Sequence, residues 1–169
     1  YMNICFLDNN PISYDHNDLS SNKIRGAERA IINLVLELNK LGHKITILNN
    51  IKSKNEYQNI RWLNINQYNQ FENFDVAITN NDINNFDKVK SKKKIAISHS
   101  IQNIEKFFRK RQFFSFIKHK PKIFLLGKYH ESNRTYFLRF FGSEIINWSI
   151  DDVFIKTQLT NTEPHKSIF

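Results

Sequence analysis

The chain has 169 residues, which is the size of one domain or of one domain with a hinge, and 40% of them are hydrophobic, so disorder is not expected. The formal net charge of +9 predicts attraction to nucleic acid, anionic lipid or phosphorylated ligands, without choosing among them. A single cysteine, Cys5, excludes an internal disulfide framework and a cysteine-rich zinc site.

The first part of the chain predicts a strand, a long loop, a helix and a second strand. Residues 3–7 read NICFL, an apolar run that indicates a buried strand, and residues 9–25 form a polar loop of a length that is usually functional or mobile. In residues 26–41 apolar side chains recur at three- and four-residue steps, which predicts a helix capped by Gly42. Residues 44–48, KITIL, predict the next strand, and such a unit is typical of parallel sheets.

The same alternation continues through the rest of the chain. The further predicted elements are strands over 60–63, 76–79 and 94–98, a short helix over 83–89, a helix over 104–119 ended by Pro121, a strand over 123–126, a helix over 128–141 capped by Gly142, and a strand over 144–147. Several of the strands are continuous apolar runs, as in sheets that are buried on both faces. The pattern therefore predicts an α/β fold with one doubly wound, mainly parallel sheet and helices on both faces.

Ligands of doubly wound folds bind at the carboxyl ends of the strands, which makes the residues after each predicted strand candidates for binding. These candidate stretches are 8–11, 25–28, 80–82, 99–100 and 127–130. The dinucleotide fingerprint G-x-G-x-x-G and the P-loop motif are both absent. The hypotheses that the protein is a dehydrogenase or a nucleoside triphosphatase therefore lose their main support from the sequence.

Gly26 stands at the start of the predicted helix, where unpaired N–H groups and a partial positive charge attract anions. Because it has no side chain, Gly26 lets an anionic or sugar ligand approach these N–H groups, with Arg25 and Ala27 beside it. Glu28, in the first turn, complements the helix dipole. The alternative stays open: Gly26 only permits the helix to start, and Glu28 is only a first-turn acid.

Polar side chains also follow two other predicted strands. Asp8, Asn9 and Asn10 end the first strand, where they either bind a ligand hydroxyl or form a turn. His99, followed by Ser100, comes directly after the strand at 94–98, and the near-neutral pKa of histidine suits hydrogen bonding or proton transfer in a cleft. A loop histidine satisfied by backbone groups is the alternative. The other histidines show no metal-ligand spacing.

Several of these motifs, in this order, resemble GT-B glycosyltransferases of the GT4 family. Residues 25–29 (RGAER), the helix after them, Leu-Gly-His and a strand resemble the family's start, which commonly reads Gly-Gly-Ala-Glu-Arg. Residues 95–99 (IAISH) resemble the strand that delivers a histidine to the family's active-site cleft. Residues 123–129 resemble a later strand, with Gly127 in place of the usual serine, and residues 145–151 resemble the interdomain hinge, with Asn-Trp-Ser in place of Pro-Asn-Gly.

The resemblance implies a Rossmann-like N-terminal, acceptor-binding domain over 1–150 and a hinge or linker over 151–169 toward a C-terminal domain that binds the nucleotide-sugar. It implies that the full-length protein, but not the isolated chain, transfers a sugar with retention from a nucleoside-diphosphate sugar to a glycan or lipid-linked acceptor of the cell envelope. His99 would contact the donor sugar or the reacting centre. Arg25 departs from the family, because it stands where the first glycine of that motif is common, and this cation would itself reach a phosphate or an acidic acceptor. The resemblance implies no metal and no cofactor on this domain.

A basic and aromatic segment follows His99. Its cations are Lys106, Arg109, Lys110, Arg111, Lys118, Lys120 and Lys122, with phenylalanines between them. On a helix this pattern gives an aromatic side and a cationic side, which is typical of helices that lie on anionic membranes. Two alternatives stay open: a helix that packs its phenylalanines on the sheet, and a surface that stacks on nucleic acid.

Targeting signals are lacking in the sequence. No signal peptide is recognisable at the start, and no stretch approaches the roughly 20 apolar residues of a spanning helix. The sequence therefore predicts a cytoplasmic protein, peripheral on the inner face of the membrane if the basic segment binds lipid. The alternative to a glycosyltransferase domain is a stand-alone basic α/β module that binds anionic lipid or nucleic acid.

Overall fold

The computed structural model describes residues 1–69, 72–80, 82–99, 111–134 and 136–146. Its strands are β1 (Asn3–Leu7), β2 (Lys44–Asn49), β3 (Asn55–Tyr57), β4 (Ile60–Asn64), β5 (Asn73–Asn80), β6 (Lys90–Ser98), β7 (Lys122–Leu125) and β8 (Ser143–Ile145). Its α-helices are α1 (Gly26–Lys40), α3 (Phe113–His119) and α4 (Lys128–Ser132), and its 3-10 helices are η1 (His16–Ser20), η2 (Ile83–Lys88) and η3 (Phe137–Phe140). The protein is therefore of the α/β class.

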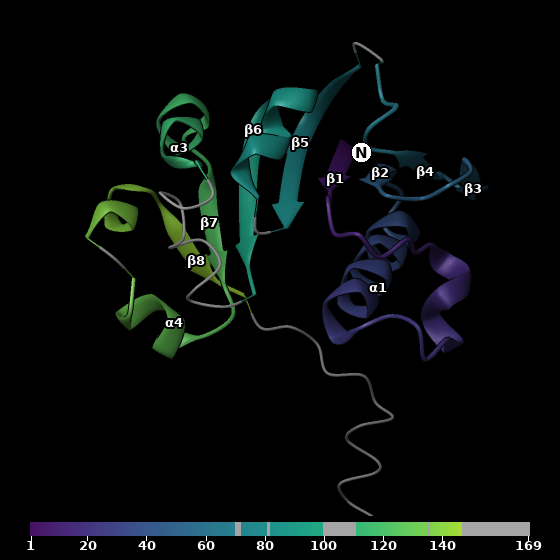
Figure 1. Ribbon diagram of the computed structural model, residues 1–169, viewed down its shortest axis with the longest axis horizontal. Coiled ribbons are helices and arrows are strands. Elements are labelled where there is room, and N and C mark those ends of the chain that lie inside the picture. The colour runs from purple at the N-terminus through teal and green to yellow at the C-terminus, as the bar shows by residue number, and fades with distance from the viewer. Residues whose placement is uncertain (70–71, 81, 100–110, 135, 147–169) are drawn as a thin grey trace, which may run out of the picture.

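The eight strands form one sheet in the order β3-β4-β2-β1-β5-β6-β7-β8 (Figure 1). Every neighbouring pair is parallel except β3 with β4. On one side of the central strand β1 lie β2 and β4, with β3 at the edge. The chain then returns to β5 on the other side of β1, and β6, β7 and β8 follow outward in order. The direction in which successive strands are added to the sheet therefore reverses between β1 and β5. The carboxyl ends of these two parallel strands lie at the same edge of the sheet.

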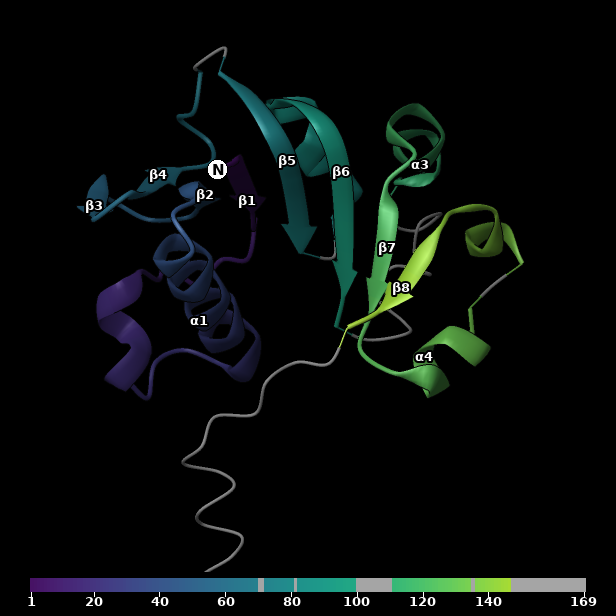
Figure 2. The ribbon, with the colours of Figure 1, turned by 180° about the vertical axis from the view of Figure 1, so that it is seen from behind.

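Side chains of the central strands alternate between the two faces of the sheet, and each face has its own core. On one face Phe6 of β1 lies in the same core as Val35 of α1. On the other face Cys5 of β1 lies in a core with Phe86 of η2 and Phe116 of α3. Figures 1 and 2 show α1 beside the half of the sheet that holds β1, β2 and β4, and α3 and α4 beside the half that holds β7 and β8. Helical elements thus pack on both faces.

The sequence predicts β1 and α1 nearly to the residue. β1 has the expected bounds, and α1 begins at Gly26 and ends one residue before the expected end. Gly42 has a left-handed φ of 89° and donates its N–H to the Asn39 carbonyl at 2.8 Å, while the His43 N–H reaches the Leu38 carbonyl at 3.2 Å. These bonds satisfy carbonyls at the end of α1, so the predicted glycine cap is confirmed.

The helix predicted over 128–141 is wrong, because this segment forms two short pieces, α4 and η3. The side chains of Ser132 and Asn133 both donate to the carbonyl of Tyr129, at 3.0 and 2.8 Å. Side-chain donors that occupy a carbonyl in this way compete with the helical hydrogen bonds. We attribute the end of α4 at Ser132 to this competition.

Within the described residues, the helix predicted over 104–119 begins later than expected. Residues 104–110 lie outside the described residues. Arg111 has a left-handed φ of 54°, which a continuous helix does not allow, and α3 begins only at Phe113. The helix ends at His119, and its C-cap Lys120 is again left-handed, at 45°, one residue before Pro121.

Cys5 is expected to react with thiol reagents only when the protein unfolds. Its side chain is fully buried, and this burial, with a smaller contribution from the Glu72 charge, raises the pKa of its thiol far above the ordinary value. Because the thiolate is the reactive form, we expect no labelling by a chromogenic disulfide reagent in native buffer and labelling of this one thiol in urea. Rapid labelling of the folded protein would contradict the buried position of β1.

Candidate functional site

Polar side chains gather at the carboxyl edge of the sheet, around the reversal between β1 and β5. They come from the loop after β1, the first turn of α1, and the residues that follow β5, β6 and β7. We call this group the edge cluster, and its members are Asp8, Asn9, Asn10, Glu28, Asp82, His99 and His130. The predicted candidates on three separate loops are therefore brought together by the fold.

Asp8 anchors the loop that follows β1. Its carboxylate is buried, and its Oδ2 accepts the Tyr14 hydroxyl at 2.8 Å while its Oδ1 accepts the Asn10 N–H at 3.0 Å. Burial, and then the Asp8 charge, raise the pKa of Tyr14, so that its hydroxyl stays a donor. The Asn49 side chain holds the Tyr14 carbonyl at 2.7 Å. Asp8 thus shapes the loop, and both of its oxygens are already hydrogen-bonded.

Glu28 joins the loop after β1 to the start of α1. Its side chain is buried, with 1% exposed. One oxygen, Oε2, accepts the backbone N–H of Arg25 at 3.0 Å, which caps the helix. The other, Oε1, accepts the Asn10 side-chain Nδ2 at 2.5 Å. Glu28 therefore does more than complement the helix dipole, because it fixes two candidate residues relative to each other.

A hydrogen bond spans the reversal between β1 and β5 directly. Asn9, after β1, donates its Nδ2 to Oδ2 of Asp82, after β5, at 2.6 Å. Asp82 is itself held in place, because its Oδ1 caps η2 by accepting the Asn84 N–H at 3.1 Å and its carbonyl accepts the Thr79 hydroxyl at 2.7 Å. Asn9 is exposed, so this pair can meet a ligand from solvent.

His99 follows β6 directly, as predicted, and its side chain is half-buried. Burial lowers the pKa of His99 below its usual value of 6.5, while the Glu28 charge raises it and His130 lowers it. The lowering of the pKa by burial outweighs the raising by Glu28, so the imidazole of His99 is neutral at neutral pH. His99 follows β6, whose carboxyl end lies at the same edge of the sheet as those of β5 and β1, which places it with the edge cluster.

His130 belongs to the edge cluster although the sequence did not single it out. It is buried in α4, and its Nε2 lies 3.5 Å from Oγ of Ser98, the last residue of β6. The sequence feature that could have identified His130 was its place in the candidate stretch 127–130, which follows the strand predicted over 123–126. Considered as a single residue, His130 was weighed only as a metal ligand, and the spacing of the histidines gave no support for that role.

The remaining predicted residues flank the edge cluster or lie outside the described part. Arg25 is the exposed N-cap of α1, with Gly26 and the half-buried Ala27 next to it. A Cβ at Gly26 would meet no atom within 4 Å, so the space beside this residue is open. Gly127 is the N-cap of α4, with an extended φ of 171° that other residues also adopt. Ser100 lies outside the described residues.

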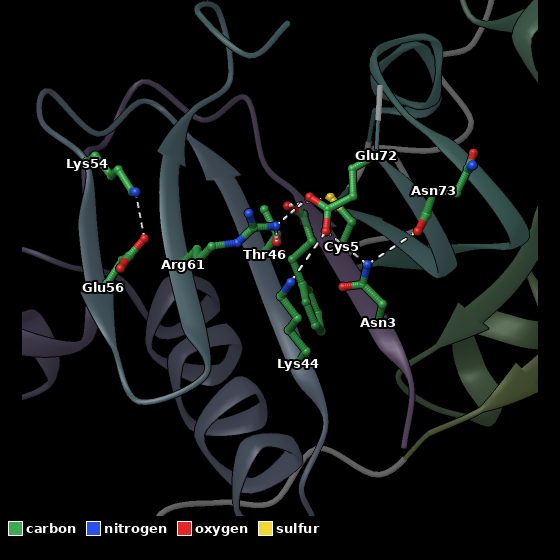
Figure 3. Close-up of polar contacts among 10 residues, drawn as sticks. Asn3, Cys5, Lys44, Thr46, Lys54, Glu56, Arg61, Glu72 and Asn73 are labelled. Atoms are coloured by element: carbon green, nitrogen blue, oxygen red, sulfur yellow. Dashed lines mark hydrogen bonds and ion pairs between the residues drawn. The ribbon is translucent and has the colours of Figure 1, made fainter. Parts of the chain in front are cut away.

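A second polar cluster lies at the opposite, amino edge of the sheet (Figure 3). The Arg61 guanidinium donates to Glu72 at 2.5 Å and to the Thr46 hydroxyl at 2.6 Å, and Asn3 donates to the same carboxylate at 3.1 Å. Partial burial opposes ionisation of Glu72, but the bonds from Arg61 and Asn3 outweigh it and lower the pKa of Glu72. These groups satisfy one another across strands, so we assign this cluster to stability.

Within the described ranges, no three or more His, Cys, Asp or Glu residues are grouped so that they could hold a metal ion. Across the same residues, no helix combines the length and the apolar character needed to cross a membrane. No protein-family profile, curated protein or solved structure matches the chain. The sequence motifs and the geometry of the edge cluster are therefore the features of the chain that bear on its function.

The fold is expected to lose stability as the pH falls below the usual histidine pKa. Folding lowers the pKa of His99, so below pH 6.5 the unfolded chain binds a proton at this residue more readily than the folded chain. This proton binding stabilises the unfolded state and lowers the free energy of unfolding. Burial lowers the pKa of His119 in the same direction, while its partner Asp87 opposes this. We expect a lower urea midpoint at about pH 5.5 than at about pH 7.5, and a smaller drop in His99→Gln. An equal drop in the variant would show that His99 is not the group responsible.

Proposed function

We propose that this chain is the acceptor-side domain of a GT-B glycosyltransferase, and that it binds a glycan or lipid-linked acceptor at the edge cluster. A C-terminal domain, reached through residues 151–169, would supply the nucleotide-sugar. The observation that carries the proposal is the Asn9–Asp82 hydrogen bond of 2.6 Å across the reversal between β1 and β5. In doubly wound, Rossmann-like sheets the point where the strand order reverses is where ligands bind.

The residue types of the edge cluster suit a ligand that is rich in hydroxyl groups. Carboxylates such as Asp82 accept hydrogen bonds from sugar hydroxyls, and the amides of Asn9 and Asn10 both donate and accept. The cluster also holds the carboxylates of Asp8 and Glu28, which disfavour a diphosphate among them. These charges fit an acceptor better than the phosphates of the donor.

His99 would act at the reacting centre. In glycosyl transfer an acceptor hydroxyl attacks the anomeric carbon of the donor, the bond from that carbon to the diphosphate breaks, and the hydroxyl proton leaves. A neutral imidazole can accept a proton or hydrogen-bond a sugar hydroxyl, and burial keeps His99 neutral by lowering its pKa. The larger contributions would be positioning of the two substrates and stabilisation of the departing diphosphate by the second domain.

The family resemblance and the geometry support each other at specific residues. The RGAER motif at 25–29 contains Glu28, and the IAISH motif at 95–99 ends in His99. These residues are far apart in the sequence, yet the charge of Glu28 acts on the titration of His99. Arg25, where the family commonly has glycine, is the exposed cation nearest to the start of α1 and would contact a phosphate or an acidic group of the acceptor.

The proposal is tested by the longest protein that the reading frame of this chain encodes. The purified protein is incubated with UDP-, GDP- and dTDP-sugars and with a glycan or membrane extract, and release of nucleoside diphosphate is measured. We expect release that depends on both one donor and the extract, and none from the 169-residue chain alone. A full-length protein that releases no nucleoside diphosphate from any donor would overturn the proposal.

A further inference from the structure

An exposed apolar patch lies on α3 and on η3 with its N-cap Tyr136, away from the edge cluster. Its members are Phe114, Ile117, Tyr136 and Phe140, and we call it the aromatic patch. The side chains of Phe114 and Phe140 are 80% and 75% exposed. Exposed apolar side chains gathered on neighbouring elements indicate an interaction surface, because single exposed ones need no explanation but a patch does.

The aromatic patch is linked by packed rings to the core beneath it. Phe114 contacts Phe113 edge-on with ring centroids 5.6 Å apart, and Phe113 stacks on Phe137 of η3 at 4.8 Å. Phe140 contacts Tyr136 edge-on at 5.5 Å. The half-buried rings of Phe113 and Phe137 thus connect Phe114 to the core, and the basic segment does not simply bury all of its phenylalanines on the sheet.

An open groove of about 700 Å³ runs between the end of α3 and η3. Its apolar lining includes Ile117, Phe137, Phe140 and Phe141. Lys120 and Lys122 line the same groove. The groove thus combines an apolar interior with ammonium groups, and it adjoins the aromatic patch because Ile117 and Phe140 belong to both.

Positive charge dominates around this surface. Lys120 and Lys122 line the groove, Lys118 and Arg139 belong to α3 and η3, and the acids that pair with two of these cations are Asp87 and Glu144. Each acid is paired, Asp87 with Lys118 at 2.5 Å and Glu144 with Lys122. In the part of the chain that the structure describes, Lys120 and Arg139 form no ion pair. The surface is therefore left with uncompensated positive charge beside exposed aromatic rings.

We propose that the aromatic patch and its groove bind the surface of a membrane that contains anionic lipid. Phenylalanine and tyrosine rings would enter the headgroup region, while Lys120 and Arg139 would contact lipid phosphates. Nucleic acid also combines with cations and aromatic rings, but it has no alkyl group to fill a groove lined by Ile117, Phe140 and Phe141. The patch extends the predicted membrane candidates, of which Arg109 and Lys110 lie outside the described residues and Arg111, Lys118 and Lys120 are exposed.

The test is co-sedimentation of the 169-residue chain with vesicles. One set contains phosphatidylcholine alone and the other contains about 30% phosphatidylglycerol, at about 50 mM and about 500 mM salt. We expect binding to the anionic vesicles at low salt, weaker binding at high salt and little binding to phosphatidylcholine. No binding to the anionic vesicles at low salt, or equal binding to both sets, overturns the proposal.

Two variants separate the patch from the general charge of the protein. The double variant Phe114→Ser/Phe140→Ser removes two exposed rings and should fold, which circular dichroism checks; we expect its binding to weaken about tenfold. The control Leu41→Ser removes an apolar side chain at the end of α1 that is 70% exposed, and it should bind like the wild type. Unchanged binding of the double variant, or binding of a single-stranded oligonucleotide without binding of vesicles, counts against a membrane surface. The aromatic patch shares no residue with the edge cluster, so either proposal can fail alone.

Discussion

Replacing Glu28 with alanine is expected to lower the free energy of unfolding by about 2 kcal/mol. The substitution removes the acceptor of the Arg25 N–H, which caps α1, and the acceptor of the Asn10 amide. Because Glu28 is 1% exposed, water does not readily replace either oxygen, and two donors lose their partner. Urea unfolding followed by circular dichroism measures the loss.

Glu37 provides the matched control on the same helix. Its carboxylate pairs with Lys40 at 2.6 Å, but its side chain is 66% exposed, so Glu37→Ala is expected to cost less than about 0.5 kcal/mol. The variant Glu28→Gln should fall between the two, because its oxygen can still accept the Arg25 N–H while its amide faces the Asn10 amide. Equal losses for Glu28→Ala and Glu37→Ala would contradict the role of Glu28 in joining the loop to α1.

Under the proposed function, replacing His99 with alanine is expected to lower kcat for nucleoside diphosphate release by the full-length protein about 100-fold, with a smaller effect on KM. His99 directly follows β6 at the carboxyl edge of the sheet, and Glu28 and His130 both influence its pKa. A group that exchanges a proton or hydrogen-bonds the sugar at the reacting centre contributes mainly in the transition state. Initial rates of nucleoside diphosphate release, measured over donor and acceptor concentrations, separate the two parameters.

His119 controls for the loss of a buried imidazole elsewhere. Burial lowers the pKa of His119 as it does that of His99, but His119 contacts Asp87 at 3.0 Å at the end of α3, away from the edge cluster. We therefore expect His119→Ala to keep its kcat, whatever it does to stability. A similar loss of kcat in both variants would mean that His99 acts through the fold alone.

Local patterns predict those parts of the fold in which burial and local sequence agree. The apolar run at 3–7 gives β1, and the three- and four-residue steps after Gly26 give α1, because one face of each must be buried. β3 (Asn55–Tyr57) has no apolar alternation, since it pairs at the sheet edge with β4, and the sequence does not reveal it. β5 and β6 start earlier than predicted, because their first residues pair along the sheet although several are polar and exposed.

The candidate site is predicted less completely, for a physical reason. The strand ends mark Asp8, Asn9, Asn10 and His99 as candidates, because parallel strands bring their carboxyl ends to one edge. The hydrogen bonds that organise the edge cluster, Asn9 with Asp82 and Asn10 with Glu28, join residues far apart in the sequence. No periodicity or spacing encodes such pairs. His130 depends in the same way on where α4 begins, and the predicted long helix over 128–141 obscured it.

The most direct test of the edge cluster compares two aspartates at the two ends of η2. Asp82 bonds Asn9 across the reversal between β1 and β5, whereas Asp87 pairs with Lys118 away from the edge. In Asp82→Asn the new side chain keeps the oxygen that caps η2 but lacks the carboxylate, and we expect kcat/KM for nucleoside diphosphate release by the full-length protein to fall about tenfold or more. We expect Asp87→Asn to leave kcat/KM unchanged. Wild-type activity in Asp82→Asn, or equal losses in both variants, would contradict a binding site at this edge of the sheet.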